Sequence, residues 1–166
     1  MWNNQKGNYF STIEQTKLKR RNFIFGFFSF ACFIKPAFAG LPKIVVYKTI
    51  TCGCCNSWIE HIRNAGFFVK AKNVTHVELV EIKRQHDIPL KMTSCHTAFI
   101  NSYFIEGHVH AEDIKALLTE KPKALGLSVP NMPLGSPGME MGEQKDPYDT
   151  YLVKRNGETE VFRSYY

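Results

Sequence analysis

Three cysteines fall within four residues of this chain, at Cys52, Cys54 and Cys55. They follow the apolar, β-rich residues 44–47 and precede a helix-like segment that begins near Asn56, so they lie at a strand-to-helix turn. The first turn of a helix leaves backbone N–H groups unpaired, and its positive dipole end favours thiolate over thiol. Thiolates bind soft metal ions and attack disulfides. The spacing therefore indicates a soft-metal or redox site.

A structural disulfide is the alternative interpretation of these cysteines. Adjacent cysteines rarely bridge each other, and three thiols so close together would crowd any single bridge. We therefore expect functional thiols here rather than a structural disulfide. Later in the chain Cys95 and His96 stand side by side and offer two further ligand types.

The elements around these residues alternate between strand and helix. The residue pattern predicts strands at 43–48, 67–72, 97–101 and 103–106, and helices at 57–65, from 75 to before 89, and at 111–119. The order is βαβαββα. A Cys-x-x-Cys pair, here Cys52 and Cys55, at the first strand-to-helix turn of this order is the thioredoxin arrangement. Where thioredoxin-like proteins carry a cis-proline facing the dithiol, residues 93–96 contain none, so Cys95 or His96 can approach the cysteine loop.

Two local signals add detail to this α/β, thioredoxin-like fold. Thr75 and Glu78 have the spacing of a capping box, and the helix that they open would present Val77, Val80 and Ile82 to the core. At the end of the chain, the alternating residues 151–155 and 159–162 flank Asn-Gly, which favours a type I′ turn. We therefore predict an added C-terminal β-hairpin.

Residues 1–39 have the features of an export signal. A cationic run at 17–21 precedes a Phe-rich apolar stretch at 23–34, and 37–39 has the small-x-small form of a cleavage site. The apolar stretch is shorter than the roughly 20 residues that span a bilayer. We expect cleavage before Gly40, a periplasmic location by the Sec or the twin-arginine route, and a single thioredoxin-like metal-binding domain at 40–166, with no membrane association after cleavage.

Charge argues against a nucleic-acid partner. The whole chain is formally +6, but residues 1–39 hold six of the Lys and Arg residues and only one acid. From Gly40 onward there are 15 Lys/Arg and 14 Asp/Glu, a net charge of +1. Nucleic-acid binding needs a concentrated basic face, and no remaining charge run supplies one.

Several motifs in fixed order resemble one known family. The segments are Thr51-Cys52-Gly53-Cys54-Cys55, Ser94-Cys95-His96-Thr97-Ala98, Ile105-Glu106-Gly107-His108-Val109 and the Pro/Gly-rich residues 129–139. Together they are similar to the CopG-like periplasmic copper-handling proteins, and the resemblance covers essentially all of residues 40–166. It implies a thioredoxin-like fold, copper bound at the cysteine loop as single ions or a multinuclear cluster, and a role in copper resistance. His110 stands where this family commonly has proline, so it is not carried over as a ligand.

The distribution of sulfur supports copper independently of the resemblance. Thiolate and thioether ligands select Cu(I), and every methionine after Met1 lies near a motif. Met92 precedes Cys95, with core filling as an equal alternative. Met132, Met139 and Met141 share one Pro/Gly-rich loop in which little core can form, so we predict that residues 130–142 close over the site as a lid.

Two histidines complete the predicted ligand set. His96, beside Cys95, is the best non-sulfur candidate because imidazole suits copper and would help to hold Cu(II). His108, at the end of the fourth strand, is the weaker candidate. The predicted metal ligands are therefore Cys52, Cys54, Cys55, Cys95, His96, His108, Met132, Met139 and Met141.

Three function classes remain open from the sequence. The first is copper binding, by storage, transfer or interconversion of Cu(I) and Cu(II), with copper ions and other periplasmic copper-handling proteins as partners. The second is a thiol–disulfide oxidoreductase, which leaves Cys54 and Cys95 without a role. The third is a structural zinc site of Cys52, Cys54 or Cys55, Cys95 and His96, which explains the methionines poorly.

Overall fold

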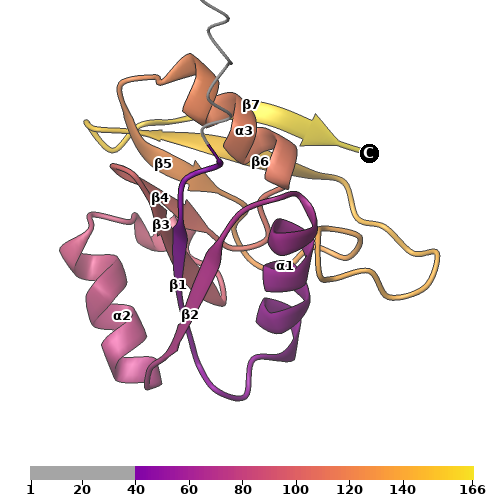
Figure 1. Cartoon of the computed structure of the whole chain (residues 1–166). Helices are drawn as coiled ribbons and strands as arrows, with labels where there is room; N and C mark the ends of the chain where they lie inside the picture. The colour runs from indigo at the N-terminus through magenta and orange to yellow at the C-terminus, as the bar shows by residue number, and fades with distance from the viewer. Residues whose placement is uncertain (1–39) are drawn as a thin grey trace, which may run out of the picture. The chain divides into compact units, whose positions relative to one another are not determined.

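A mixed seven-stranded sheet runs through residues 40–166, the part of the chain that the computed structural model describes (Figure 1). The strand order is β2-β1-β3-β4-β5-β6-β7. The pairs β1/β2 and β4/β5 are parallel, and the other neighbours are antiparallel. The export signal predicted for residues 1–39 lies outside the described residues. The elements are β1 (Ile44–Lys48), α1 (Gly53–Asn64), β2 (Val69–Asn73), α2 (His76–Gln85), the short 3₁₀ turn η1 (Leu90–Met92), β3 (His96–Ile100), β4 (Tyr103–Glu106), α3 (Ala111–Glu120), β5 (Ala124–Ser128), β6 (Tyr148–Lys154) and β7 (Thr159–Tyr165).

The mixed α/β class and the element order from β1 to α3 agree with the sequence prediction. The classification as thioredoxin-like stays a prediction from that order. Of the described helices, none is long and apolar enough to cross a membrane.

Helices cover both faces of the sheet. Figure 1 shows α2 on the opposite side of β1 from α1. Side chains of α1 and α3 form the larger apolar core with the strand residues that alternate toward them. This core includes Trp58 and Ile62 of α1, Ile114 and Leu117 of α3, and Ile44, Val46 and Ile105 of the sheet.

Helix α1 begins earlier than the sequence pattern predicts, at Gly53 rather than at residue 57. Cys52 is its N-cap, with extended backbone angles and no side-chain capping hydrogen bond. Cys54 and Cys55 therefore belong to the first helical turn instead of to a loop. This placement holds their sulfurs on a rigid element.

The capping box of α2 is confirmed, but the predicted buried face of that helix is wrong. The Glu78 N–H donates to Thr75 Oγ1 at 3.2 Å, and the Thr75 N–H donates to Glu78 Oε2 at 2.7 Å. The side chains of Val77 and Val80 are exposed instead of packing on the core. Leu79 and the cation Lys83 are buried in their place, because Lys83 reaches a carboxylate beneath the helix.

Two predictions about the end of the chain need correction. The sequence pattern missed β5, which contains no β-branched or aromatic residue and exists because β4 and β6 pair with it on both sides. The C-terminal hairpin is present, yet its turn is not type I′, since Gly157 has a positive φ of 82° and Asn156 does not. Residues 155–158 connect β6 to β7, and the Gly157 N–H donates to the Lys154 carbonyl at 3.0 Å.

A buried ion pair joins α2 to the centre of the sheet. Lys83 pairs with Glu106 of β4, and both side chains also bond to Thr97 of β3, with Thr97 Oγ1 2.8 Å from Lys83 Nζ and 2.7 Å from Glu106 Oε2. Burial raises the pKa of Glu106, and the charge of Lys83 partly offsets that effect. Removing any one of these three side chains would therefore leave a buried polar group of the other two without its hydrogen-bond partner.

We expect Lys83→Met to destabilise the protein by about 3–5 kcal/mol, because the substitution leaves Glu106 buried without its cation. Urea unfolding followed by circular dichroism measures this change. Glu112→Ala, which breaks the exposed pair between Glu112 and Lys115 on α3, is the matched control and should change the midpoint little. Equal midpoints for the two variants would show that the buried pair does not stabilise the fold.

Candidate metal centre

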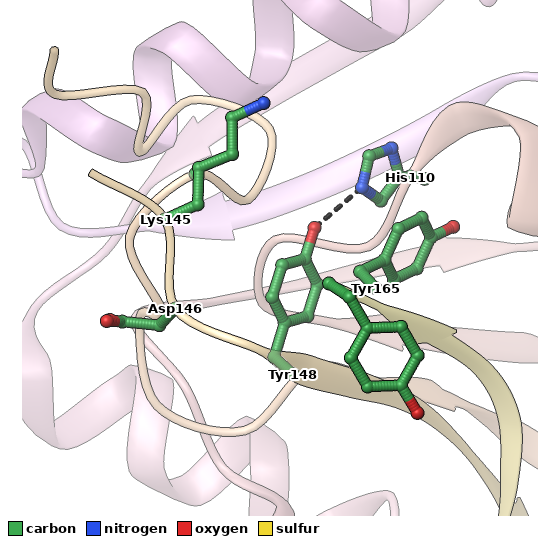
Figure 2. A pocket seen from close by; sticks show the side chains of 7 residues that line it. His110, Lys145, Asp146, Tyr148 and Tyr165 are labelled. Carbon is green, nitrogen blue, oxygen red and sulfur yellow. Dashed lines mark hydrogen bonds between the residues drawn. The ribbon is translucent and has the colours of Figure 1, made fainter. Parts of the chain in front are cut away.

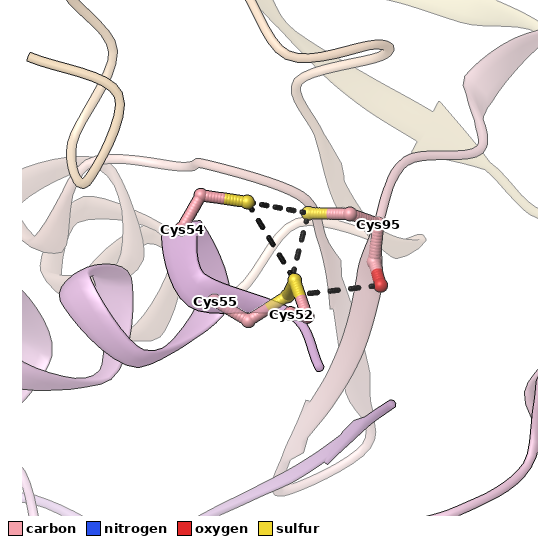
Figure 3. Close-up of side chains that lie close together, drawn as sticks. All are labelled: Cys52, Cys54, Cys55 and Cys95. Atoms are coloured by element: carbon pink, nitrogen blue, oxygen red, sulfur yellow. Dashed lines mark hydrogen bonds between the residues drawn. A yellow bond between two sulfur atoms is a disulfide. The ribbon is translucent and has the colours of Figure 1, made fainter. Parts of the chain in front are cut away.

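Two chain segments bring four cysteines together. Cys52, Cys54 and Cys55 lie at the start of α1, and Cys95 lies between η1 and β3. Figure 3 shows the Cys95 sulfur pointing toward the sulfurs of Cys54 and Cys55. The ligand atoms of all four cysteines lie within 4.8 Å of one another.

The sulfur separations suit a shared metal ion. Cys52 Sγ lies 3.6 Å from Cys54 Sγ, and Cys95 Sγ lies 3.8 Å from Cys54 Sγ and 3.5 Å from Cys55 Sγ. A tetrahedral site with metal–sulfur bonds of about 2.3 Å separates its sulfurs by about 3.8 Å. These three separations therefore match those of a tetrahedral site, whereas the sulfurs of Cys52 and Cys55 would have to move apart.

The structure differs from the sequence expectation in one bond, because Cys52 and Cys55 form a disulfide. Their Cα atoms are 5.4 Å apart, within the range that a disulfide spans. The crowding argument fails because the helical turn leaves room for this bond. The sulfur of Cys54 stays unbonded 3.6 Å from that of Cys52, and it also contacts Cys95 and Met132. Cys54 and Cys95 remain free thiols. Reduction of the bond would supply the other two metal-binding sulfurs.

The position of Cys95 is set by its neighbours on β4. Glu106 Oε1 accepts the Ser94 N–H at 2.6 Å, which ties the segment before Cys95 to the buried ion pair. Gly107 lies so close to this segment that an added Cβ would stand 2.6 Å from the Ser94 side chain and 2.4 Å from the Val129 carbonyl oxygen. Only glycine fits at this crossing, where φ is also positive at 72°.

His108 presents one ring nitrogen to the cluster. Its Nδ1 lies 2.8 Å from the Pro137 carbonyl oxygen, and a carbonyl can only accept, so Nδ1 carries the proton. Nε2 therefore has a free lone pair in the neutral ring and lies 3.1 Å from Cys95 Sγ. Burial lowers the pKa of His108, which favours that neutral ring. A histidine that donates one N–H to a carbonyl and aims the other nitrogen at a thiol has the arrangement of a metal ligand.

His96 is close to the cluster but less freely placed. Its Nδ1 lies 3.3 Å from Cys95 Sγ, while its buried Nε2 has no hydrogen-bond partner within residues 40–166. The ring packs against Trp58 at a centroid distance of 4.4 Å. Burial, followed by the charges of His108 and Lys83, lowers the pKa of His96 well below its usual range. Sequence reasoning ranked His96 above His108, but the hydrogen bond that the His108 Nδ1–H donates to the Pro137 carbonyl makes His108 the better oriented of the two.

The Pro/Gly-rich loop after β5 packs against the site from several directions. Asn131 forms a bridge with Ser94, and Pro137 holds His108. A Cβ added to Gly138 would lie 2.9 Å from the Cys54 carbonyl oxygen and 2.6 Å from the backbone nitrogen of Trp58, so the loop backbone packs against the first two turns of α1. The loop therefore packs beside the cysteine cluster, and its role as a lid stays a prediction.

The methionines of this loop differ in their relation to the sulfurs. Met132 Sδ lies 4.0 Å from Cys54 Sγ. Met141 is 68% exposed and Met139 is half-buried. Among these three methionines of the described residues, Met132 alone has its sulfur in contact with a cysteine sulfur of the cluster. Met92 is buried in the small core beside Ile88 and Phe104, as in the core-filling alternative.

His110 belongs to a different pocket, shown in Figure 2. Its Nε2 lies 2.6 Å from Tyr148 Oη, and its ring stacks on Tyr165 at 4.1 Å. Tyr165 Oη and Thr150 Oγ1 each donate to the buried Asp113 at 2.8 Å. This network ties the C-terminal hairpin to α3.

Comparisons with known proteins converge on one group. A family model described as a protein of unknown function, DUF411, matches residues 92–139. Two solved structures, copper resistance protein CopG in forms 2 and 1, share 39% and 40% sequence identity with TM-scores of 0.71 and 0.70. Each alignment covers 76% of this chain, and 99% and 98% of the respective CopG chain. No curated protein matched.

The fold and the cluster define an α/β protein whose cysteine–histidine centre is suited to soft metal ions. The similarity extends over nearly the full length of both solved structures. The chain belongs to the CopG family of copper resistance proteins, as the sequence motifs predict.

We expect metal binding by the reduced protein to strengthen as pH rises. Burial and the neighbouring Cys54 raise the pKa of the Cys95 thiol to about 12, so the thiol is protonated at neutral pH. A metal ion must displace that proton, and each displaced proton raises the apparent affinity about tenfold per pH unit. Competition with a Cu(I) chelator at pH 6, 7 and 8 measures the slope. A flat profile would show that Cys95 binds metal without losing a proton, or does not bind it.

Proposed function

We propose that this protein is exported to the periplasm and contributes to copper resistance by binding Cu(I) at its reduced cysteine cluster and interconverting Cu(I) and Cu(II). The observation that carries the proposal is the meeting of four cysteine sulfurs within 4.8 Å of one another. Membership of the CopG family supports the choice of copper, since the solved relatives are copper resistance proteins. Other copper-handling proteins of the same compartment are its expected partners.

The donor set supports Cu(I) over harder ions. Thiolates and a thioether select Cu(I), and the Met132 sulfur stands beside Cys54. Cys95 belongs both to the group of four cysteines and to a second group with His96 and His108. A metal ion in each group would share the Cys95 thiolate, so the cluster has the donors for more than one copper ion.

A second candidate function is thiol–disulfide exchange. The disulfide between Cys52 and Cys55 at the start of α1 specifically favours it, because helix N-termini lower thiol pKa values and Cys52 is only half-buried. This function gives no role to His108 or to Met132. A structural zinc site would use the same four sulfurs and also leaves Met132 unexplained.

Metal titration separates these functions. Reduced protein is titrated with Cu(I), Cu(II) and Zn(II), and the bound metal is counted per chain. Copper binding predicts tight Cu(I) uptake with weaker Zn(II) uptake. Preferential Zn(II) binding, or insulin reduction at the rate of a dithiol oxidoreductase without Cu(I) binding, would contradict it.

We expect Cys54→Ser to weaken Cu(I) binding by more than about tenfold, which corresponds to about 1.4 kcal/mol. The substitution removes the sulfur that contacts Cys52, Cys95 and Met132. It leaves the Cys52 and Cys55 pair available for thiol exchange. Competition for Cu(I) against a chelator measures the loss, and an unchanged affinity together with active thiol exchange would favour the oxidoreductase function.

Met132→Leu should lower Cu(I) affinity by roughly tenfold, because the change keeps apolar volume and removes the thioether. Met141→Leu is the matched control from the same loop, since that side chain is 68% exposed. The same chelator competition, run on both variants, compares them. Equal affinities would make the loop a cover without a ligand.

A further inference from the structure

The four cluster cysteines exist in the structure as two unlike pairs. Cys52 and Cys55 are joined by a disulfide, and Cys54 and Cys95 are free thiols (Figure 3). The disulfide has lost two electrons relative to its thiols. The cluster is therefore able to store and release electrons within the group of donors that would hold a metal ion.

We propose that the Cys52 and Cys55 dithiol is the electron donor that reduces Cu(II) at this cluster, while Cys54 and Cys95 hold the Cu(I) produced. In the balanced step, two thiolates and two Cu(II) ions give one Cys52–Cys55 disulfide and two Cu(I) ions. The two sulfur–copper contacts of the donors break as the sulfur–sulfur bond forms. This inference rests on the proposed copper function and assigns the residues that carry its redox step.

The backbone allows this pair to act without rearrangement. The Cα atoms of Cys52 and Cys55 are already 5.4 Å apart, as disulfide formation requires. Cys52 is a half-buried N-cap at the edge of the cluster, where an incoming ion can reach it. Cys55 is fully buried, and its sulfur faces Cys95 at 3.5 Å. Cys52 is thus accessible to solvent, and the Cys55 sulfur contacts the Cys95 sulfur inside the cluster.

The donors that remain after oxidation suit the reduced ion. Cys54 Sγ and Cys95 Sγ are 3.8 Å apart, with Met132 Sδ beside the first and His108 Nε2 beside the second. Two thiolates with a thioether favour Cu(I) over Cu(II), which draws the reaction toward reduction. If all four cysteines were oxidised to two disulfides, no thiolate would remain to bind Cu(I).

Copper bound at Cys54 and Cys95 also protects the new disulfide. Their sulfurs lie 3.6 Å and 3.5 Å from Cys52 and Cys55, close enough to attack the bond as free thiolates. Coordination occupies the sulfur electrons that such an attack needs. Once Cu(I) leaves, a dithiol reductant in the same compartment can restore the pair by thiol–disulfide exchange.

The test adds a Cu(II) salt to the fully reduced chain without oxygen and without other reductant. Electron paramagnetic resonance follows the Cu(II) signal, and peptide mass spectrometry identifies the linked cysteines. We expect about two equivalents of Cu(II) per chain to lose their signal while a Cys52–Cys55 linkage appears. Persistence of the signal, or a linkage between other cysteines, would overturn the assignment.

Cys52→Ser is the decisive variant. Serine is a better N-cap than cysteine, so the substitution favours α1 while it removes one electron donor. We expect the rate of loss of the Cu(II) signal to fall at least about tenfold, because the Cys55 sulfur then has no Cys52 sulfur with which to form the disulfide. Ser57→Ala, an exposed change on the same helix, is the control and should behave as the unchanged chain. An equal rate in Cys52→Ser would overturn the proposal.

Direct titration of the same proteins with Cu(I) separates this inference from the proposed function. Failure of the reduced chain to bind Cu(I) would overturn both. Cu(I) binding without loss of the Cu(II) signal would leave copper binding intact and overturn the electron-donor assignment alone.

Discussion

The Glu106 carboxylate is buried at the centre of the sheet, and it must find partners for both oxygens because a buried charge without them is costly. Lys83 from α2, Thr97 from β3 and the Ser94 amide supply them. These bonds join one helix, two strands and the segment that carries Cys95. The orientation of α2 follows from the same contact, since Lys83 displaces apolar residues from the buried face. The buried ion pair thus helps to position a thiol just before the start of β3.

Cys95 is the point at which the two donor groups meet. Its sulfur contacts the cysteines of α1 on one side and the nitrogens of His96 and His108 on the other. Three separate segments converge there, and the loop that carries Met132 and Pro137 completes the enclosure. Because Cys95 is half-buried and its pKa is raised, the site without metal holds a protonated thiol rather than a thiolate. Metal binding and proton release are therefore linked.

The same sulfurs serve two kinds of chemistry that exclude each other. A disulfide between Cys52 and Cys55 removes two thiolates from coordination, and an ion that cannot accept electrons, such as Zn(II), prevents the disulfide while it is bound to them. Copper differs from zinc in this setting, because copper can accept the electrons that disulfide formation releases. The division of the cluster into a bonded and a free pair is the basis of the proposal that copper binding and electron transfer share one site.

The sequence alone determined the features that depend on near neighbours. The thiols at a strand-to-helix turn, the Thr75 capping box, the order of elements and the C-terminal hairpin all follow from local spacing and backbone preference. The family resemblance, carried by motifs in fixed order, was also available at that level. Only the tertiary structure decided that α2 buries Lys83 and that β5 exists between two partners.

Tertiary structure also decided how the predicted ligands differ from one another. The Pro137 carbonyl sets the tautomer of His108 from 29 residues away, and Met132 rather than Met139 or Met141 meets Cys54 across 78 residues. The structure also decided that Cys52 pairs with Cys55 while Cys54 stays a free thiol. No local pattern encodes these choices, because each depends on which distant backbone packs against the side chain.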